Sequence, residues 1–134
     1  PDNWEHAPFY NLPLEELVQS VKKALSEGYT VAWDGDISEA GFDSRNGIAV
    51  CLTPPSITQT YRQQEFEKFK TTDDHMMHLI GTAHDNEGHL FYVLKNSWGK
   101  HGTHQGYIYM SENYFRAKTI SITLPKKFVD IRIK

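Results

Sequence analysis

Two strand-like segments joined by a tight turn constrain the fold of this chain more than any other feature. Residues 75–84 and 89–98 are rich in apolar and aromatic side chains, and the four residues DNEG separate them. Strands favour such apolar and aromatic residues, whereas Asp, Asn and Gly favour turns. The pattern predicts an antiparallel hairpin, in which the start of the first strand lies beside the end of the second.

The remaining segments predict an α+β fold in a single domain, residues 1–134. The clearest helix is expected at residues 13–27, because Leu14, Val18 and Val21 recur at helical spacing and Gly28 follows. We expect an antiparallel sheet or half-open β-barrel packed on this N-terminal helix. The other predicted elements are a helix at 56–70 capped by Ser56, a helical turn at 111–117, strands at 29–34, 47–53, 106–110 and 119–125, and a strand edge in the tail at 126–134.

Composition and charge exclude several kinds of partner. The chain has 14 basic and 17 acidic side chains and a net charge of −3, so no basic surface for nucleic acid is expected. No apolar run approaches the roughly 20 residues that span a bilayer, so no membrane span is expected.

Cys51 is the only cysteine, which excludes an internal disulfide and a cysteine-based zinc site. Because the chain begins at Pro1 and not at Met, we expect that a leader was removed or that a longer protein contains this segment.

The predicted hairpin would bring His75 and Asn96 together, although they lie 21 positions apart. An amide oxygen that accepts the imidazole N–H fixes the orientation of the ring, and Trp98 would shield that bond from water. The other ring nitrogen would then be free to accept a proton from a nucleophile. Each residue taken alone also has an ordinary structural interpretation: a surface histidine, a turn-forming asparagine and a core tryptophan.

Two motifs resemble those of a known family. The segment DDHMMHLIG at 73–81 resembles the histidine segment of papain-like cysteine peptidases, and KNSWG at 95–99, followed by GYIYM, resembles their asparagine segment. The intervening KHGTHQGY is similar to the bleomycin hydrolase and aminopeptidase C branch. VAWDGDIS at 31–38 and NGIAV at 46–50 are similar to the lead-in of that branch, so the resemblance covers roughly residues 9–125.

The resemblance implies a fold, a function and roles for residues. It implies the barrel-like right half of the papain architecture, with His75 as general base, Asn96 as the residue that orients it and Trp98 as their cover. The family's nucleophilic cysteine and oxyanion-hole glutamine lie on a preceding helical half, and no matching segment occurs in these residues. We therefore expect the C-terminal part of a cysteine-type aminopeptidase that hydrolyses peptides and is inactive without its N-terminal half.

The resemblance also implies some properties of the whole protein. The branch is commonly cytoplasmic, often forms homo-oligomers and needs no cofactor, and a C-terminal arm partly fills its cleft. Whether the tail at 126–134 supplies such an arm stays open. The alternative from a different functional class is a catalytically dead module that binds peptides or a protein partner along the same edge.

Other candidate residues have weaker support. Cys51 lies in an apolar segment with no helix starting at it, which favours an inert core residue over the nucleophile of an independent hydrolase. Asp34 and Asp36 are expected as turn residues, with a possible second role in holding the amine of a substrate at the cleft. No metal site is expected, since His75 and His78 point to opposite faces of a strand. The other histidines considered as ligands are His84, His89, His101 and His104.

Overall fold

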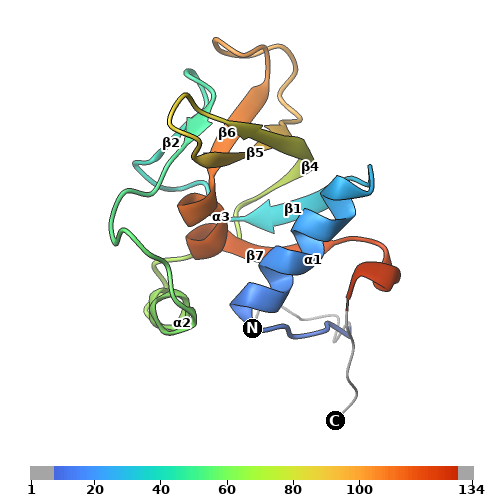
Figure 1. Cartoon of the computed structure of the whole chain (residues 1–134). Helices are drawn as coiled ribbons and strands as arrows, with labels where there is room; N and C mark the ends of the chain where they lie inside the picture. Colours follow the sequence, from blue (N-terminus) through green and yellow to red (C-terminus); the bar gives the residue numbers. More distant parts are fainter. Residues whose placement is uncertain (1–7, 130–134) are drawn as a thin grey trace.

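A computed structural model describes residues 8–129 of the chain as one mixed sheet with helices against it (Figure 1). Its elements are α1 (Leu14–Ser26), β1 (Val31–Gly35), β2 (Phe42–Asp43), β3 (Ile48–Ala49), α2 (Gln59–Glu67), β4 (His75–His84), β5 (Leu90–Lys95), β6 (Tyr107–Ser111), α3 (Glu112–Lys118), β7 (Thr119–Thr123) and a short 3-10 helix η1 (Lys126–Phe128). Among the described residues no helix is both long and apolar enough to cross a membrane.

The seven strands have the order β2-β3-β6-β5-β4-β1-β7. All neighbouring strands are antiparallel except β3 and β6, which run parallel. The expected α+β fold is confirmed, and the parallel pair is the departure from the expected antiparallel sheet. After Asp43 the chain folds back, so that β3 runs antiparallel to β2. In this direction β3 is parallel to its other neighbour, β6. The backbone N–H of Tyr109 donates to the carbonyl of Gly47 at 2.8 Å at this contact.

The hairpin of β4 and β5 forms as predicted. Its register pairs His84 with Leu90 at the turn and His78 with Lys95 near the open end. The carboxylate of Asp85 accepts the backbone N–H groups of Glu87 and His89 at 2.9 and 2.8 Å, which stabilises the turn. A bulge between Leu79 and Gly81 shifts the register once.

Helix α1 lies across one face of the sheet, against β1 and β4. Its first backbone N–H, that of Leu14, donates to the side-chain carbonyl of Gln59 at 2.8 Å, so a residue from α2 satisfies this helix end. The buried stripe follows the predicted helical spacing, with Ala24 added to it. Its apolar members are Leu14, Val18, Val21 and Ala24, with Leu17 and Leu25 packed at the edge.

Trp33 on β1 anchors the core between β1 and β7. Its side chain is fully buried, and its indole N–H donates to the hydroxyl of Thr119 at 2.8 Å. Burying an indole without such a partner would cost free energy, so this bond lets the largest core side chain be enclosed. On β4, Leu79 is fully buried while Ile80 keeps 38% of its surface exposed, which confirms the predicted alternation of faces.

Several predicted boundaries are wrong. Helix α2 is capped by Thr58, whose hydroxyl accepts the N–H of Tyr61 at 3.1 Å, and not by Ser56, which lies too far upstream. Strand β5 ends at Lys95, and β2 was not predicted because it has only two residues. The tail was expected as a strand edge, but residues 126–128 form η1 and residues 130–134 lie outside the described part.

The alternation on β4 makes a testable prediction about stability. Leu79→Ala should lower the free energy of unfolding by about 2–5 kcal/mol, because it leaves a cavity in a closed core. Ile80→Ala on the opposite face is the matched control and should cost less than about 1 kcal/mol. Urea unfolding followed by tryptophan fluorescence measures both, and equal losses would contradict the assigned faces.

Candidate active site

The candidate site lies at the edge of the sheet where β1 ends, β4 begins and β5 ends. His75 is the first residue of β4 and is paired with Gly35, the last residue of β1. Asn96 follows the last residue of β5 directly, and its backbone N–H donates to the carbonyl of Gly106 at 2.9 Å. Three strands thus position one imidazole and one amide at the same edge.

The predicted meeting of His75 and Asn96 is confirmed. The ring Nε2 of His75 lies 2.8 Å from the amide oxygen Oδ1 of Asn96. Asn96 is 4% exposed, whereas the histidine ring is partly open to solvent. The same Oδ1 accepts the backbone N–H of Ser97 at 2.7 Å, so two donors face this atom and fix which end of the amide points at the ring.

This arrangement selects one tautomer of neutral His75. A carbonyl oxygen only accepts hydrogen bonds, so Nε2 holds the proton and Nδ1 presents its lone pair. Among residues 8–129 no side chain is hydrogen-bonded to Nδ1. The site therefore offers an oriented proton acceptor that faces outward from the bond to Asn96.

Trp98 packs against the histidine ring. The two ring centroids are 4.9 Å apart, and the ring planes differ by 33°. Trp98 nevertheless keeps 48% of its own surface exposed, an unusual fraction for an indole in a packed position. Trp98 covers one side of the His75 ring, and the outer face of Trp98 itself is open to solvent.

Glycines in the loop after Trp98 allow the close contacts that hold Asn96 in place. Gly106 has φ +87°, and a Cβ there would collide with the carbonyl oxygen of Gly99. Gly102 has φ +69°, and a Cβ there would collide with the backbone of Ser44 and Arg45. Both positions need glycine, because L-residues rarely adopt this conformation and no space is left for a side chain.

Asp34 and Asp36 differ from the expectation that both are turn residues. Asp34 lies within β1 and accepts a hydrogen bond from the hydroxyl of Ser121 at 3.2 Å. Burial, together with the neighbouring carboxylate of Asp73, raises the pKa of Asp34 to about 6.

Asp36 is 1% exposed and belongs to a buried polar network with Lys118. Sequence reasoning missed Lys118, since no local pattern connects residues 82 positions apart.

The remaining candidate residues, Cys51 and the other histidines, are not bonded to the pair of His75 and Asn96. Burial raises the pKa of the Cys51 thiol, which donates to the carbonyl of Thr53 at 3.4 Å. Such a thiol is a poor nucleophile, in line with the inert role favoured above. Among residues 8–129 no three histidine, cysteine or acidic side chains are grouped as a metal site. The exposed histidines are His78, His84, His89, His101 and His104.

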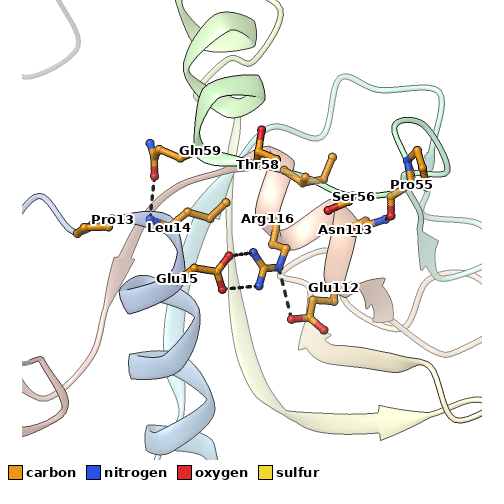
Figure 2. A pocket seen from close by; sticks show the side chains of 11 residues that line it. Pro13, Leu14, Glu15, Pro55, Ser56, Thr58, Gln59, Glu112, Asn113 and Arg116 are labelled. Carbon is orange, nitrogen blue, oxygen red and sulfur yellow. Dashed lines mark hydrogen bonds and ion pairs between the residues drawn. The ribbon is translucent and has the colours of Figure 1, made fainter.

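A separate cavity of about 510 Å³ lies between the starts of α1, α2 and α3 (Figure 2). Its charged groups are already paired: Arg116 binds both carboxylate oxygens of Glu15, at 2.6 and 2.8 Å, and also contacts Glu112. His75 and Asn96 do not line it. The cavity is therefore not part of the candidate active site.

The raised pKa of Asp34 predicts how stability depends on pH. In the unfolded chain the carboxyl releases its proton near pH 3.8, whereas the folded chain holds it until about pH 6. Folding therefore retains a proton between these values, and the free energy of unfolding falls as pH rises through this window. Asp34→Asn removes this dependence, so its stability should fall less than that of the wild type between pH 4 and 6.

Urea unfolding at a series of pH values measures this effect. Asp85→Asn is the control: hydrogen bonds from His89 lower the pKa of Asp85, so its contribution to stability changes at a pH below this window. Parallel curves for wild type and Asp34→Asn between pH 4 and 6 would contradict the assignment.

Comparison with known proteins is consistent with this geometry. Aminopeptidase W of Lactobacillus delbrueckii subsp. lactis is 25% identical over 131 residues, covering 93% of this chain and 30% of the relative. Aminopeptidase G of the same organism is 24% identical over 134 residues, covering 90% of this chain and 29% of the relative. The chain thus spans less than a third of the length of these curated relatives.

A solved structure and a family model support the same relationship. The crystal structure of PepW from Lactobacillus rhamnosis HN001 matches with a TM-score of 0.71 at 21% identity, covering 89% of this chain and 28% of that one, which shows the same fold. The model of the Peptidase C1-like family matches residues 3–134. The match confirms the resemblance expected from the histidine and asparagine motifs. The chain belongs to the Peptidase C1-like family.

Proposed function

We propose that this chain is the C-terminal, base-bearing part of a cysteine-type aminopeptidase. The observation that supports it most is the bond from His75 Nε2 to the buried Oδ1 of Asn96, which leaves Nδ1 as an oriented proton acceptor. The named relatives are aminopeptidases W and G, and family membership makes peptidase chemistry the natural use of this pair. The nucleophile would come from a helical half that precedes this segment.

In the proposed reaction, His75 moves protons at its Nδ1 atom. It accepts the proton of the cysteine thiol, and the thiolate attacks the carbonyl carbon of a peptide bond. The C–N bond then breaks as the imidazolium donates its proton to the leaving amine nitrogen. A water then gives a proton to Nδ1 as its oxygen attacks the resulting thioester. The C–S bond breaks, which releases the acid, and the imidazolium returns its proton to the thiolate.

An amide beside the ring suits this chemistry. Asn96 holds the ring orientation through every proton transfer, because its bond to Nε2 persists whether Nδ1 is protonated or not. A carboxylate in the same place would neutralise the imidazolium, whereas an amide leaves its charge available to stabilise a thiolate. Trp98, stacked 4.9 Å from the ring, limits water on one side of the pair.

The proposal extends to the whole protein. Its substrates would be peptides cleaved from the amino end, as the names of the relatives suggest. We expect a cytoplasmic location, consistent with one free thiol, and a homo-oligomer, both taken from the resemblance to the bleomycin hydrolase branch. The half-exposed outer face of Trp98 would contact the helical half.

The coding sequence upstream of Pro1 provides the first test. It should encode a glutamine and then a cysteine at the start of a helix, since the thiolate and the oxyanion hole must both come from there. A reading frame that begins at or just before Pro1 would contradict the peptidase proposal. The alternative, a module that only binds peptides or a partner, would then be preferred.

Mutation of the base in the full-length protein provides the second test. His75→Ala should lower kcat/KM for aminoacyl p-nitroanilide hydrolysis by about 10²–10⁴-fold, the usual contribution of a positioned general base. His78→Ala is the matched control, because this exposed histidine lies on the same strand but on the opposite face. Activity that survives His75→Ala would remove the assignment of the base.

A further inference from the structure

Lys118, the last residue of α3, is a buried cation far from the candidate site in sequence. It is 6% exposed, and its Nζ lies 3.5 Å from Oδ2 of Asp36, 3.1 Å from the carbonyl oxygen of Lys70 and 3.3 Å from the hydroxyl of Thr71. It also donates to Glu39. Burial would lower the pKa of Lys118, but Glu39 and Asp36 outweigh this and raise it, so the ammonium remains charged. One cation therefore joins two loops, residues 36–39 and 70–71.

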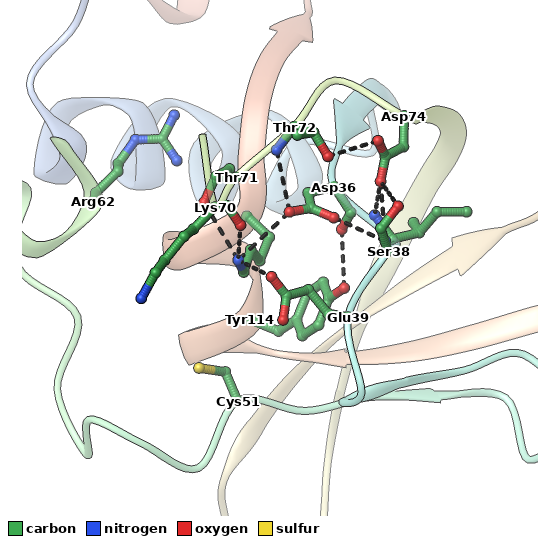
Figure 3. A network of polar contacts seen from close by, with 12 residues as sticks. Asp36, Ser38, Glu39, Cys51, Arg62, Lys70, Thr71, Thr72, Asp74 and Tyr114 are labelled. Carbon is green, nitrogen blue, oxygen red and sulfur yellow. Dashed lines mark hydrogen bonds and ion pairs between the residues drawn. The ribbon is translucent and has the colours of Figure 1, made fainter. Parts of the chain in front are cut away.

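Asp36 transmits this anchoring toward β4. Its carboxylate accepts the backbone N–H of Ser38 at 2.8 Å and that of Thr72 at 3.2 Å. Its own backbone N–H donates to the carbonyl of Lys118 at 3.0 Å, and its carbonyl accepts the hydroxyl of Tyr114 at 2.9 Å. Asp36 is thus bonded on both its main chain and its side chain, and it ties the loop after β1 to the segment before β4 (Figure 3).

Asp74, the residue before His75, completes the connection. One carboxylate oxygen accepts the backbone N–H groups of Ile37 and Ser38 at 3.1 and 3.0 Å, and the other accepts the hydroxyl of Thr72 at 2.7 Å. Burial would raise the pKa of Asp74, but the bonds from Ser38 and Thr72 outweigh it and hold the pKa well below its usual range. The carboxylate is therefore ionised and fixed on both sides.

One backbone bond and the side-chain network continue the connection beyond the ladder at this end of β4. Just before β4 begins, the backbone N–H of Asp74 donates to the carbonyl of Gly35 at 3.4 Å. A bond of this length exceeds the usual N–H···O distance of about 2.7–3.2 Å and is weak. The side-chain bonds of Asp74 therefore add to the restraint on the backbone directly before His75.

We propose that Lys118 is a positioning residue for His75. Its ammonium fixes the loop of Asp36, this loop fixes Asp74, and Asp74 sets the place from which the His75 ring reaches Asn96. An effect of Lys118 on catalytic activity rests on the proposed function, whereas its effect on the position of the His75 ring does not. No substrate contact is assigned to Lys118.

The first test observes the His75 ring directly in the protein labelled with ¹⁵N-histidine. The wild type should show a slowly exchanging proton on Nε2, because Asn96 accepts it. Lys118→Met removes the cation and should abolish this signal or shift the ring toward the other tautomer. The indole N–H signal of Trp33, bonded to Thr119, reports that the core remains folded.

The matched control is Lys22→Met, which breaks an ion pair of 2.9 Å with Glu112 outside the network and should leave the His75 signal unchanged. A folded Lys118→Met protein with the wild-type His75 signal would overturn the proposal. If Lys118→Met does not fold, Asp74→Asn replaces it, since Asp74 is exposed as a residue and tolerates the change better. An unchanged His75 signal in that variant would also overturn the proposal.

Kinetics of the full-length enzyme separates this proposal from the proposed function. Lys118→Met should lower kcat about 10- to 100-fold with little change in KM, because a displacement of about 1 Å at a catalytic group can cost about 10²-fold. If His75→Ala leaves activity intact, the proposed function fails while the ring signal still tests Lys118. If His75→Ala abolishes activity and Lys118→Met leaves kcat unchanged, the positioning role fails alone.

Discussion

The antiparallel pairing of β4 with β5 is the constraint on which the site depends. Its ladder pairs His78 with Lys95, so His75 and Asn96 lie just beyond the last paired residues at the open end. There the two side chains meet at 2.8 Å across the gap between the strands. A register shift of one residue would turn the amide to the opposite face of the sheet, and the bond to the ring would be lost.

A second constraint acts on the other side of the histidine. The ladder between β1 and β4 ends at Gly35, and beyond it a buried network of charged and hydroxyl groups continues the connection. Lys118 lies at its centre, and Asp36 and Asp74 extend it toward the strand. Buried charges are retained only when each has partners, so the network holds these loops in one arrangement. Asn96 orients the His75 ring from one side, while the network restrains the backbone next to His75 from the other.

Helix α1, the hairpin of β4 and β5, and the meeting of His75 with Asn96 were predictable because they rest on local signals. A turn sequence between two strand-like segments is enough to define a hairpin, and a hairpin places its open ends together. The parallel pairing of β3 with β6 was not predictable: a strand was expected at 47–53, but β3 has only two residues and nothing local sets which strand it pairs with or in which direction. Asp34 was expected in a turn because glycine follows it, yet it lies in β1, where burial and Asp73 raise its pKa.

The amino-acid sequence by itself determined the helix, the hairpin and the pair of residues at its open end, since each depends on neighbours within a few positions or on one short turn. Only the tertiary structure decided the partners of Lys118 and the tautomer of His75. Asp36 and Lys118 lie 82 positions apart, and their approach depends on how α3 packs beside the end of β1. The tautomer depends on which end of the Asn96 amide faces the ring, and the backbone N–H of Ser97 settles this only in the folded loop.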